Sequence, residues 1–230
     1  MKREIIITSD GSSTIHLPDW NEQYHSKHGA IQEAYHVFIK HGLYHFLETV
    51  LISEPSEEHP KATILEIGFG TGLNAFITLL ESEKINKKID YTGVEGYPVL
   101  MDEVKQLNYS SELQTDKSEL FFHKIHSIPW EEKNEITGQF TLTKQKKFFS
   151  EIDDESKYHI IYFDAFGARV QPELWTEAVF EKMYNALKPG GILVTYSAKG
   201  SVRRAMLSVG FAVEKLPGPP GKREMLRAQK

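Results

Sequence analysis

The sequence predicts an α/β fold, in which helices cover both faces of an open and mostly parallel sheet. Two stretches, Ala62–Ile67 and Tyr158–Phe166, are runs of aliphatic and aromatic residues, which is typical of parallel strands buried on both faces. The first run passes through a group of glycines into a segment whose apolar residues repeat at helical spacing. Acidic residues stand at the ends of three predicted strands (Glu66, Glu95 and Asp164), where open α/β sheets bind their ligands.

The composition indicates one substantial hydrophobic core. With 230 residues, 40% of them hydrophobic, the chain suits one domain with an N-terminal addition. We expect residues 1–52 to form an N-terminal extension, made of a hairpin and a helical cover, and residues 53–230 to form the main domain. No apolar run is long enough to span a bilayer, and the one after Arg3 is too short for a secretion signal, so we expect a cytoplasmic protein without membrane contact.

Several classes of site are excluded by residue usage. The chain has no cysteine, which rules out disulfides, thiolate metal sites and a cysteine nucleophile. Its ten histidines show no zinc-protease spacing, so no metal site is expected. A net charge of −5 argues against a protein that coats nucleic acid nonspecifically.

Basic charge is nevertheless concentrated at the C-terminal end. From Lys199 onward, eight basic residues stand against two acidic ones, a net charge of +6, while the rest of the chain carries −11. The cluster around residues 217–223 is consistent with a phosphate-binding patch, and equally with an ordinary solvated surface.

The first 61 residues are predicted to form a hairpin, a loop and a helical segment. Residues 4–8 and 14–17 can pair across Asp10-Gly11, a strong turn signal. The aromatic and polar loop 19–29 suits either a cover for one end of the sheet or a lid over a ligand. Ala30–Val50 has a helical apolar stripe that is interrupted at Gly42, so it is one helix or two. Residues 53–61 are predicted to be a solvated linker.

The remaining elements continue the α/β pattern. Further strands are predicted at Asp90–Glu95, at Ile192–Tyr196 after a tight turn at residues 188–191, and in a terminal strand pair. The third strand is either Leu120–Ile125 or Phe140–Lys144. Helices are expected at residues 98–107, from Pro172 onward and at 201–209.

The glycine-rich turn after Ile67 is suited to holding a ligand. Glycines at 68, 70 and 72 let the backbone turn sharply, and the following helix offers free N–H groups at the same place. Position 73 is leucine rather than the last glycine of a dinucleotide fingerprint, which weakens a nicotinamide or flavin interpretation. Glu95 lies 23 residues after Gly72, close to the spacing of about 20 at which an acid binds a ribose diol. Such a turn can also serve only to pack a helix closely on a sheet.

Four motifs in order resemble the MnmC-like methyltransferases, called MnmD when the domain stands alone. They comprise residues 66–74, Asp164-Ala-Phe166 with Pro172–Trp175, residues 221–226, and Tyr24-His-Ser26 followed by Glu33 and Val37-Phe38. The similarity covers roughly residues 18–228. Two features depart from the family pattern: Gly167–Pro172 lacks the usual lysine, although Arg169 is adjacent, and a Gly-Asp pair near Lys147 is absent.

The resemblance implies a Rossmann-like class I methyltransferase fold and a tRNA-modifying activity. Such an enzyme transfers a methyl group from S-adenosyl-L-methionine (SAM) to the primary amine of 5-aminomethyl-2-thiouridine at the wobble position, with the tRNA anticodon arm as its partner. The two-domain members carry a flavin oxidase that prepares this amine, for which this chain has no room. We therefore expect no flavin here, and the sequence leaves open whether a separate oxidase partner supplies the amine. The alternatives are a SAM-dependent transferase acting on a small amine or protein side chain, aminopropyl transfer included, and a catalytically silent RNA-binding module.

The resemblance also implies roles for individual residues. Asp164 is the expected catalytic residue, which accepts a hydrogen bond from the amine and orients it. The expected cofactor-binding residues are Glu66, Gly68, Phe69, Gly70, Thr71, Gly72, Asn74, Glu95, Gly96, Tyr24 and Ser26. The expected substrate-binding residues, for the flipped base or the anticodon phosphates, are Phe166, Arg169, Tyr196, Arg203, Arg204, Lys222 and Arg223.

Overall fold

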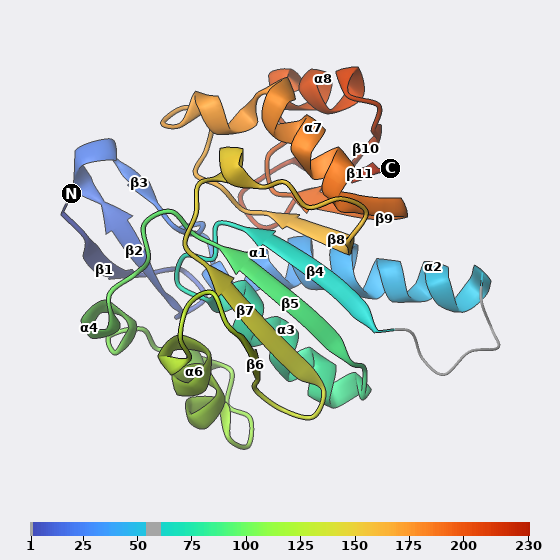
Figure 1. Cartoon of the computed structure of the whole chain (residues 1–230). Coiled ribbons are helices and arrows are strands. Elements are labelled where there is room, and N and C mark those ends of the chain that lie inside the picture. Colours follow the sequence, from blue (N-terminus) through green and yellow to red (C-terminus); the bar gives the residue numbers. More distant parts are fainter. Residues whose placement is uncertain (1, 54–60) are drawn as a thin grey trace.

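An eight-stranded sheet forms the centre of the computed structural model, which describes residues 2–53 and 61–230 (Figure 1). Its strands, in spatial order, are β10 (Ala212–Pro217), β11 (Glu224–Gln229), β9 (Leu187–Thr195), β8 (Tyr158–Phe163), β4 (Ala62–Ile67), β5 (Ile89–Val94), β7 (Phe140–Gln145) and β6 (Lys133–Glu135). Strands β9, β8, β4, β5 and β7 run parallel, and the edge strands pair antiparallel. The strand order reverses between β4 and β8, so the carboxyl ends of these two strands flank the crevice where such sheets bind ligands.

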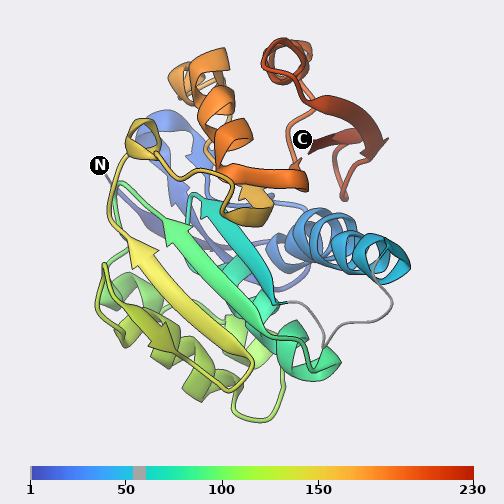
Figure 2. The same ribbon diagram turned by 45° about the vertical axis from the view of Figure 1, so that its right-hand side comes forward.

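Helices cover both faces of this sheet, as the sequence predicts (Figures 1 and 2). They are α1 (Ala30–Ala34), a π-helix (Tyr35–Tyr44), α2 (His45–Ser53), α3 (Leu73–Ile85), α4 (Met101–Val104), α5 (Tyr109–Glu112), α6 (Ser118–Ser127), α7 (Glu177–Ala186) and α8 (Gly200–Ser208). Short 3-10 turns lie at Pro18–Trp20, Phe149–Glu151 and Pro172–Trp175. The first helices pack with α3 and α6 on one face, and α7 and α8 pack on the other.

Successive residues of the central strands enter two different cores. In β8, Ile160 and Tyr162 face the α3 side, while Ile161 and Phe163 face the α7 side. This period-2 alternation between two apolar layers explains why the strands appear in the sequence as continuous hydrophobic runs.

Residues 30–53 form one uninterrupted helical stretch, which resolves the choice between one helix and two. Gly42 does not break it. A Cβ on this glycine would lie 3.0 Å from Tyr162 Cε1 and 3.2 Å from Val194 Cγ2, so the glycine lets the helix approach β8 and β9 closely. The segment therefore shares its core with the sheet, and the division of the chain at residue 53 stays a prediction.

The N-terminal hairpin is confirmed: β1 (Glu4–Ile7) pairs antiparallel with β2 (Ser13–Leu17), which also pairs with the short strand β3 (Glu22–Gln23). The turn is fastened to the next element, because Asp10 Oδ2 accepts a hydrogen bond of 3.0 Å from the N–H of Gln32 in the first turn of α1. Figure 1 shows the hairpin beyond the carboxyl ends of β5 and β7.

Some sequence-based expectations are corrected. The third strand is Phe140–Gln145, and Leu120–Ile125 belongs to helix α6. Residues 188–191 form an irregularity within β9 rather than a turn before it, and the register with β8 shifts there. The segment from Pro172 is a 3-10 turn before α7, and only Met101–Val104 of the segment 98–107 is an α-helix. Most of the predicted linker, residues 54–60, lies outside the described residues.

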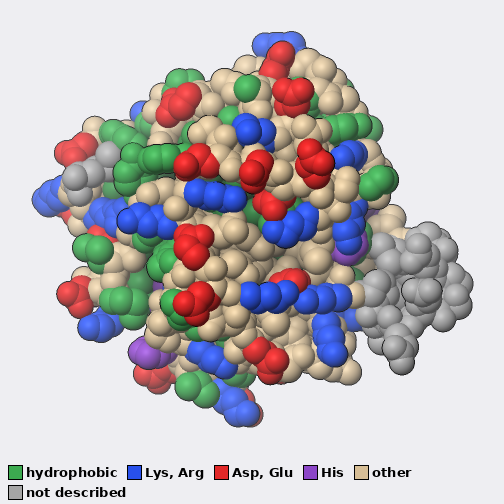
Figure 3. Space-filling model, viewed as in Figure 1, with side chains coloured by type: hydrophobic (Ala, Val, Ile, Leu, Met, Phe, Trp, Pro, Cys, Tyr) green, Lys and Arg blue, Asp and Glu red, His purple; other side chains and the backbone are tan. Residues whose placement is uncertain are grey.

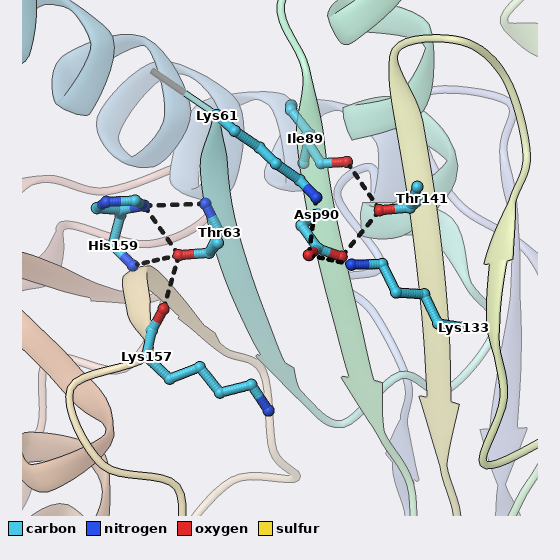
Figure 4. Close-up of polar contacts among 8 residues, drawn as sticks. All are labelled: Lys61, Thr63, Ile89, Asp90, Lys133, Thr141, Lys157 and His159. Atoms are coloured by element: carbon cyan, nitrogen blue, oxygen red, sulfur yellow. Dashed lines mark hydrogen bonds and ion pairs between the residues drawn. The ribbon is translucent and has the colours of Figure 1, made fainter.

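Polar side chains tie the amino ends of the strands together (Figure 4). Asp90 of β5 pairs with Lys61 at 2.9 Å and Lys133 at 2.5 Å, and it accepts a hydrogen bond of 2.8 Å from Thr141 of β7. Burial opposes ionisation of Asp90, but these donors lower the pKa of its carboxyl below the usual value. This edge is therefore built for cohesion, opposite the edge that carries the predicted site.

Within residues 2–53 and 61–230, no helix is long and apolar enough to cross a membrane. Figure 3 shows acidic and basic side chains interspersed on one face, without an extended area of one sign.

Candidate active site

A large cavity lies over the carboxyl ends of β4, β5 and β8. Its volume is about 1410 Å³, above the range of roughly 300–1,000 Å³ that is usual for one small ligand. Its walls come from the glycine turn, the loops after β5 and β8, and the N-terminal segment 20–28. The lining includes most of the predicted site residues: Tyr24, Ser26, Gly68, Phe69, Gly70, Thr71, Asn74, Glu95, Gly96, Asp164, Phe166, Arg169, Tyr196 and Lys222.

Side chains at two positions of the glycine turn would be strained or would clash. Gly68 has φ +90°, and a Cβ there would lie 2.6 Å from the carbonyl oxygen of Asp164. Gly70 has φ +50°, and a Cβ there would lie 3.0 Å from Tyr24 Cδ1. Both values of φ are unfavourable for residues with a Cβ. The turn thus packs against the end of β8 on one side and the N-terminal segment on the other.

One amide joins the two acids at the ends of β4 and β8. Asn74 Nδ2, in the first turn of α3, donates to Glu66 Oε1 at 3.0 Å and to Asp164 Oδ2 at 2.8 Å. Glu66 is fully buried, and its Oε2 and Asn74 Oδ1 have no hydrogen-bond partner among the described residues. Asn74 lines the cavity, so its unpartnered oxygen is suited to accepting a hydrogen bond from a ligand, and the Glu66 carboxyl lies buried behind it.

Both acids bind protons more tightly than usual. Burial, opposed by the Asn74 hydrogen bond and aided by the nearby Asp164, raises the pKa of Glu66 well above its ordinary value. Burial and the carboxylate of Glu33 raise the pKa of Asp164 to about 7, while Asn74 and Lys222 act in the opposite direction. A carboxyl that titrates near neutral pH can accept or release a proton under physiological conditions.

Glu95 holds the backbone on two sides of the cavity. Its Oε2 accepts a hydrogen bond of 2.9 Å from the N–H of Gly70, and its Oε1 accepts one of 2.9 Å from the N–H of Tyr97. Each carboxylate oxygen keeps a second lone pair. The side chain can therefore accept ligand hydroxyl protons while it fixes the loop.

Aromatic rings from distant parts of the chain meet at the roof. The ring of Phe166 makes edge-to-face contacts with Trp20 at 5.9 Å and Tyr24 at 4.9 Å between centroids. Arg169 secures this roof, because its guanidinium donates to the carbonyl oxygens of Trp20 and Asn21 at 3.2 and 3.0 Å and pairs with Glu22 at 3.0 Å. In this position Arg169 joins the loop after β8 to the N-terminal segment.

An ion pair closes the side of the cavity formed by the C-terminal hairpin. Lys222, in the loop between β10 and β11, pairs with Glu33 of α1, and its Nζ lies 4.5 Å from the centroid of the Tyr196 ring. Tyr196 donates its hydroxyl to the carbonyl oxygen of Ala165 at 2.8 Å. Glu33 and Lys222 thus lie on the same side of the cavity as Asp164, whose pKa responds to both.

Five predicted residues are not part of the cavity wall, namely Glu66, Gly72, Arg203, Arg204 and Arg223, and two that are, Phe69 and Thr71, also have packing roles. Gly72 precedes α3 beneath the turn, and Thr71 is buried, with its hydroxyl 3.4 Å from His25 Nε2. The ring of Phe69 fills the space over Gly93, where a Cβ would lie 2.3 Å from it. The side chains of Arg203, Arg204 and Arg223 are not part of the cavity wall.

The residues present fit SAM. SAM brings donors, an ammonium and a ribose diol, and the cavity wall offers acceptors, which are the unpartnered oxygen of Asn74 and the spare lone pairs of Glu95. A bare diol suits a carboxylate, which would repel a phosphate in the same place. The strained glycine turn allows a ligand to approach the backbone without obstruction from a Cβ.

Comparison with known proteins supports this interpretation. The sequence pattern of a family described as S-adenosyl-L-methionine-dependent methyltransferase matches residues 108–230, more than half of the chain. The chain belongs to this family. The methyltransferase therefore uses SAM as its cofactor, as the sequence motifs predicted.

Curated relatives agree with the resemblance to MnmC-like methyltransferases and confirm it. The chain is 28% identical over 225 residues to the tRNA 5-methylaminomethyl-2-thiouridine biosynthesis bifunctional protein MnmC of Marinomonas sp. (strain MWYL1), with 91% of this chain and 31% of that protein covered. It is 30% identical over 214 residues to the MnmC of Leptospira interrogans serovar Lai (strain 56601), with 90% and 32% covered. The methyltransferase thus spans about a third of the length of the curated relatives it matches.

Solved structures agree on the fold. MnmC2 from Aquifex aeolicus superposes with a TM-score of 0.73 at 26% identity, covering 99% of this methyltransferase and 69% of that chain. A probable spermidine synthase from Corynebacterium glutamicum ATCC 13032 has a TM-score of 0.51 at 16% identity, covering 99% and 76%, which shows a shared fold alone. The predicted α/β class I methyltransferase fold is confirmed.

The structure adds residues that the motifs did not assign to the site. Glu33 is 6% exposed and lines the cavity, and Arg3 lines it while donating to the carbonyl oxygen of Tyr97 at 3.0 Å and pairing with Glu103 at 2.9 Å. Glu33 could have been found from the sequence, since a carboxylate at a buried position of a helix requires a partner. Arg3 could not. Among the described residues, no cluster of three or more His, Asp or Glu side chains is arranged to hold a metal ion.

Proposed function

We propose that this methyltransferase methylates the primary amine of 5-aminomethyl-2-thiouridine at the wobble position of tRNA. The observation that carries the proposal is the alignment of about 90% of the chain with the MnmC proteins, whose name states a role in tRNA 5-methylaminomethyl-2-thiouridine biosynthesis. The cavity supports it independently, because its volume of about 1410 Å³ is sufficient for a cofactor and a nucleoside together. A transferase for small amines or protein side chains, the alternative, has no comparable support from relatives.

Asp164 is the residue to which we assign the orientation and deprotonation of the amine. When bound, SAM supplies an electrophilic methyl group, so the attacking nitrogen must be uncharged and aligned with it. An amine that arrives as an ammonium must first lose a proton, and a carboxyl with a pKa of about 7 is matched to accept it. Proton transfer to an Asp164 oxygen leaves the electron pair on nitrogen.

The residues around Asp164 are assigned to the cofactor and to the base. Asn74 would accept a hydrogen bond from the cofactor's amino group, with Glu66 bracing this amide from behind. Glu95 would bind the ribose hydroxyls, and Gly68 and Gly70 would let the backbone pass beside the cofactor. Of the other members of the predicted cofactor set, all but Gly72 line the same cavity. Phe166 and Tyr196 are the candidates for stacking on a base that leaves the helix stack.

The proposal extends to partners and location. The anticodon arm would contact basic side chains outside the cavity, for which Arg203, Arg204 and Arg223 remain the candidates. An oxidase would prepare the amine, as the resemblance to the MnmC-like family implies, and the curated relatives are bifunctional proteins. We further propose a cytoplasmic location and a methyltransferase domain that spans residues 53–230, with 1–52 as its N-terminal extension.

The test is methylation of tRNA in a purified system. Labelled SAM is incubated with tRNA from a strain that accumulates the aminomethyl uridine, and nucleosides are analysed by mass spectrometry. A gain of one methyl group on that nucleoside, lost with Asp164→Ala, supports both the reaction and the residue. Absence of the gain in protein that binds SAM would refute the wobble-uridine assignment. Spermidine-type amines in the same assay distinguish the alternative.

A further inference from the structure

The ammonium of Lys222 is held inside the cavity, although its position in a basic segment suggested contact with phosphates. It pairs with Glu33 and lies 4.5 Å from the centroid of the Tyr196 ring. A carboxylate and an aromatic face together form a receptor for an organic cation. The cavity therefore contains a cation-binding place that the chain itself fills.

This receptor is built independently of Lys222. Glu33 is 6% exposed, and its Oε2 accepts a hydrogen bond of 2.9 Å from the N–H of Ser26. The Tyr196 hydroxyl is fixed on the carbonyl oxygen of Ala165, the residue after Asp164. If the lysine left, the carboxylate and the ring would stay in place beside the proposed catalytic carboxyl.

Lys222 can leave without a change in the backbone. Its loop is held by hydrogen bonds from Lys222 N–H to the carbonyl oxygen of Pro219 at 2.9 Å and from Gly218 N–H to that of Arg223 at 3.1 Å. The lysine side chain is 32% exposed, and its flexible four-carbon stem lets the ammonium turn outward by rotamer changes alone.

We propose that Glu33 and Tyr196 form the subsite for the substrate's amino group, and that Lys222 occupies this subsite as an internal stand-in until the substrate displaces it. The inference rests on the proposed function, because it specifies how the same cavity receives an amine. A protonated aminomethyl group and the lysine head are both primary alkylammonium ions, so one receptor suits both. Once displaced, the lysine charge is available to a phosphate of a polyanionic substrate.

Displacement keeps Asp164 in the same electrostatic surroundings. The Lys222 ammonium opposes the rise of the Asp164 pKa, while Glu33 promotes it. The substrate ammonium carries the same charge in the same place, so it takes over the effect of the lysine on Asp164. Asp164 then takes its proton from the bound ammonium, which keeps the electron pair on nitrogen as it becomes the neutral amine.

Benzylamine, an aminomethyl group on an aromatic ring, is the probe for the subsite. Its binding to the whole chain is measured by isothermal titration calorimetry at neutral pH, without tRNA. Lys222→Met should tighten binding about tenfold, because the probe no longer competes with an ammonium held on an aromatic face. Glu33→Gln should weaken it about tenfold, since the amide still accepts the Ser26 N–H but lacks the charge.

The matched control is Lys215→Met. This lysine belongs to β10 of the same hairpin, pairs with Glu224 at 3.0 Å and is 49% exposed, outside the cavity wall. It should leave the benzylamine affinity at the wild-type value. Equal affinities for Lys222→Met and wild type, or tightening by both lysine variants alike, would overturn the proposal.

A measurement on the unaltered chain covers the case in which Lys222→Met does not fold. The side-chain ammonium signal of Lys222 should be protected from solvent exchange in nitrogen-detected NMR, and saturating benzylamine should abolish that protection. Persistent protection with benzylamine bound would refute displacement. Because neither assay requires methyl transfer, failure of the tRNA assay and failure of this inference can be told apart.

Discussion

Replacement of Asn74 by leucine tests whether the two strand-end acids act through their shared amide. The change keeps the branched shape of the side chain but removes the donor that binds Glu66 Oε1 and Asp164 Oδ2. A hydrogen bond to a carboxylate favours its ionised form, so its loss must raise the pKa of both acids. If Asp164 acts ionised, the variant should need a higher pH to work.

The size of the effect follows from the strength of one such bond. A hydrogen bond to a charged group contributes about 1.5–3 kcal/mol, and each pH unit corresponds to about 1.36 kcal/mol. Because Asp164 borders the cavity, we take the lower end, an upward move of about one pH unit. From a wild-type pKa of about 7, this lowers the ionised fraction at pH 7 about fivefold.

The assay is the pH profile of kcat/KM for tRNA methylation between pH 6 and about 9.5, the range that brackets this carboxyl. The acid limb should move upward and the rate should approach the wild-type value on the alkaline side. Thr78→Val is the control, since its hydroxyl binds the backbone carbonyl of Asn74 one turn along α3 and touches neither acid. An unchanged acid limb in Asn74→Leu, or the same displacement in Thr78→Val, would refute the reasoning.

Three further variants test how Asp164, Gly68 and Asp90 affect the stability of the fold. Asp164→Asn should raise the free energy of unfolding at pH 8 by about 2 kcal/mol. Because the pKa of Asp164 is raised, the contribution of this carboxyl to stability is fully present below pH ~4 and is lost as pH rises through about 7. Urea unfolding at low pH should therefore show no gain for the variant. Gly68→Ala, at φ +90°, should lower the free energy of unfolding by about 1–3 kcal/mol and weaken SAM binding in calorimetry. Gly138→Ala is the control, since an added Cβ would have no atom within 4 Å, and it should change neither quantity. Asp90→Asn should lower the free energy of unfolding by about 1 kcal/mol near neutral pH without changing kcat. Because the pKa of Asp90 is lowered in the folded state, its contribution to stability is present above its pKa in the unfolded chain and is lost as pH falls through its pKa in the folded protein. In acid, the stabilities of the wild type and the variant should therefore converge.

The sheet could be predicted from the sequence because its central strands are buried on both faces. Such strands need hydrophobic residues at every position, which gives Ala62–Ile67 and Tyr158–Phe163 a signal that needs no tertiary information. The third strand stayed open between two candidates in the sequence, and the structure decides it. Phe140–Gln145 alternates buried and half-buried residues, whereas Phe122 and Ile125 in the other candidate are buried at helical spacing.

The helical interruption assigned to Gly42 shows where local propensity is insufficient. A glycine inside an apolar helical stripe is a reasonable place for a break. Here it marks the place where the helix crosses Tyr162 and Val194 of the sheet. Propensity and close packing both favour glycine at such a position, and only the neighbouring element distinguishes them.

Local sequence is also insufficient at the cavity: the acids at the carboxyl ends of the strands could be predicted, but the residues that contact them could not. Glu66, Glu95 and Asp164 follow from strand order, because parallel strands bring their carboxyl ends to one edge. Glu33 and Lys222 come from helix α1 and the last hairpin, and no local pattern relates them. The sequence does indicate that Glu33 needs a partner, since Glu33 lies beside Ala34 at the buried face of its helix and a buried carboxylate requires a cation or a proton. It does not indicate which residue that partner is. Because the fold supplies the cation from a loop that can release it, removal of Lys222 should act on amine binding, and a lysine on a solvated surface would have no such effect.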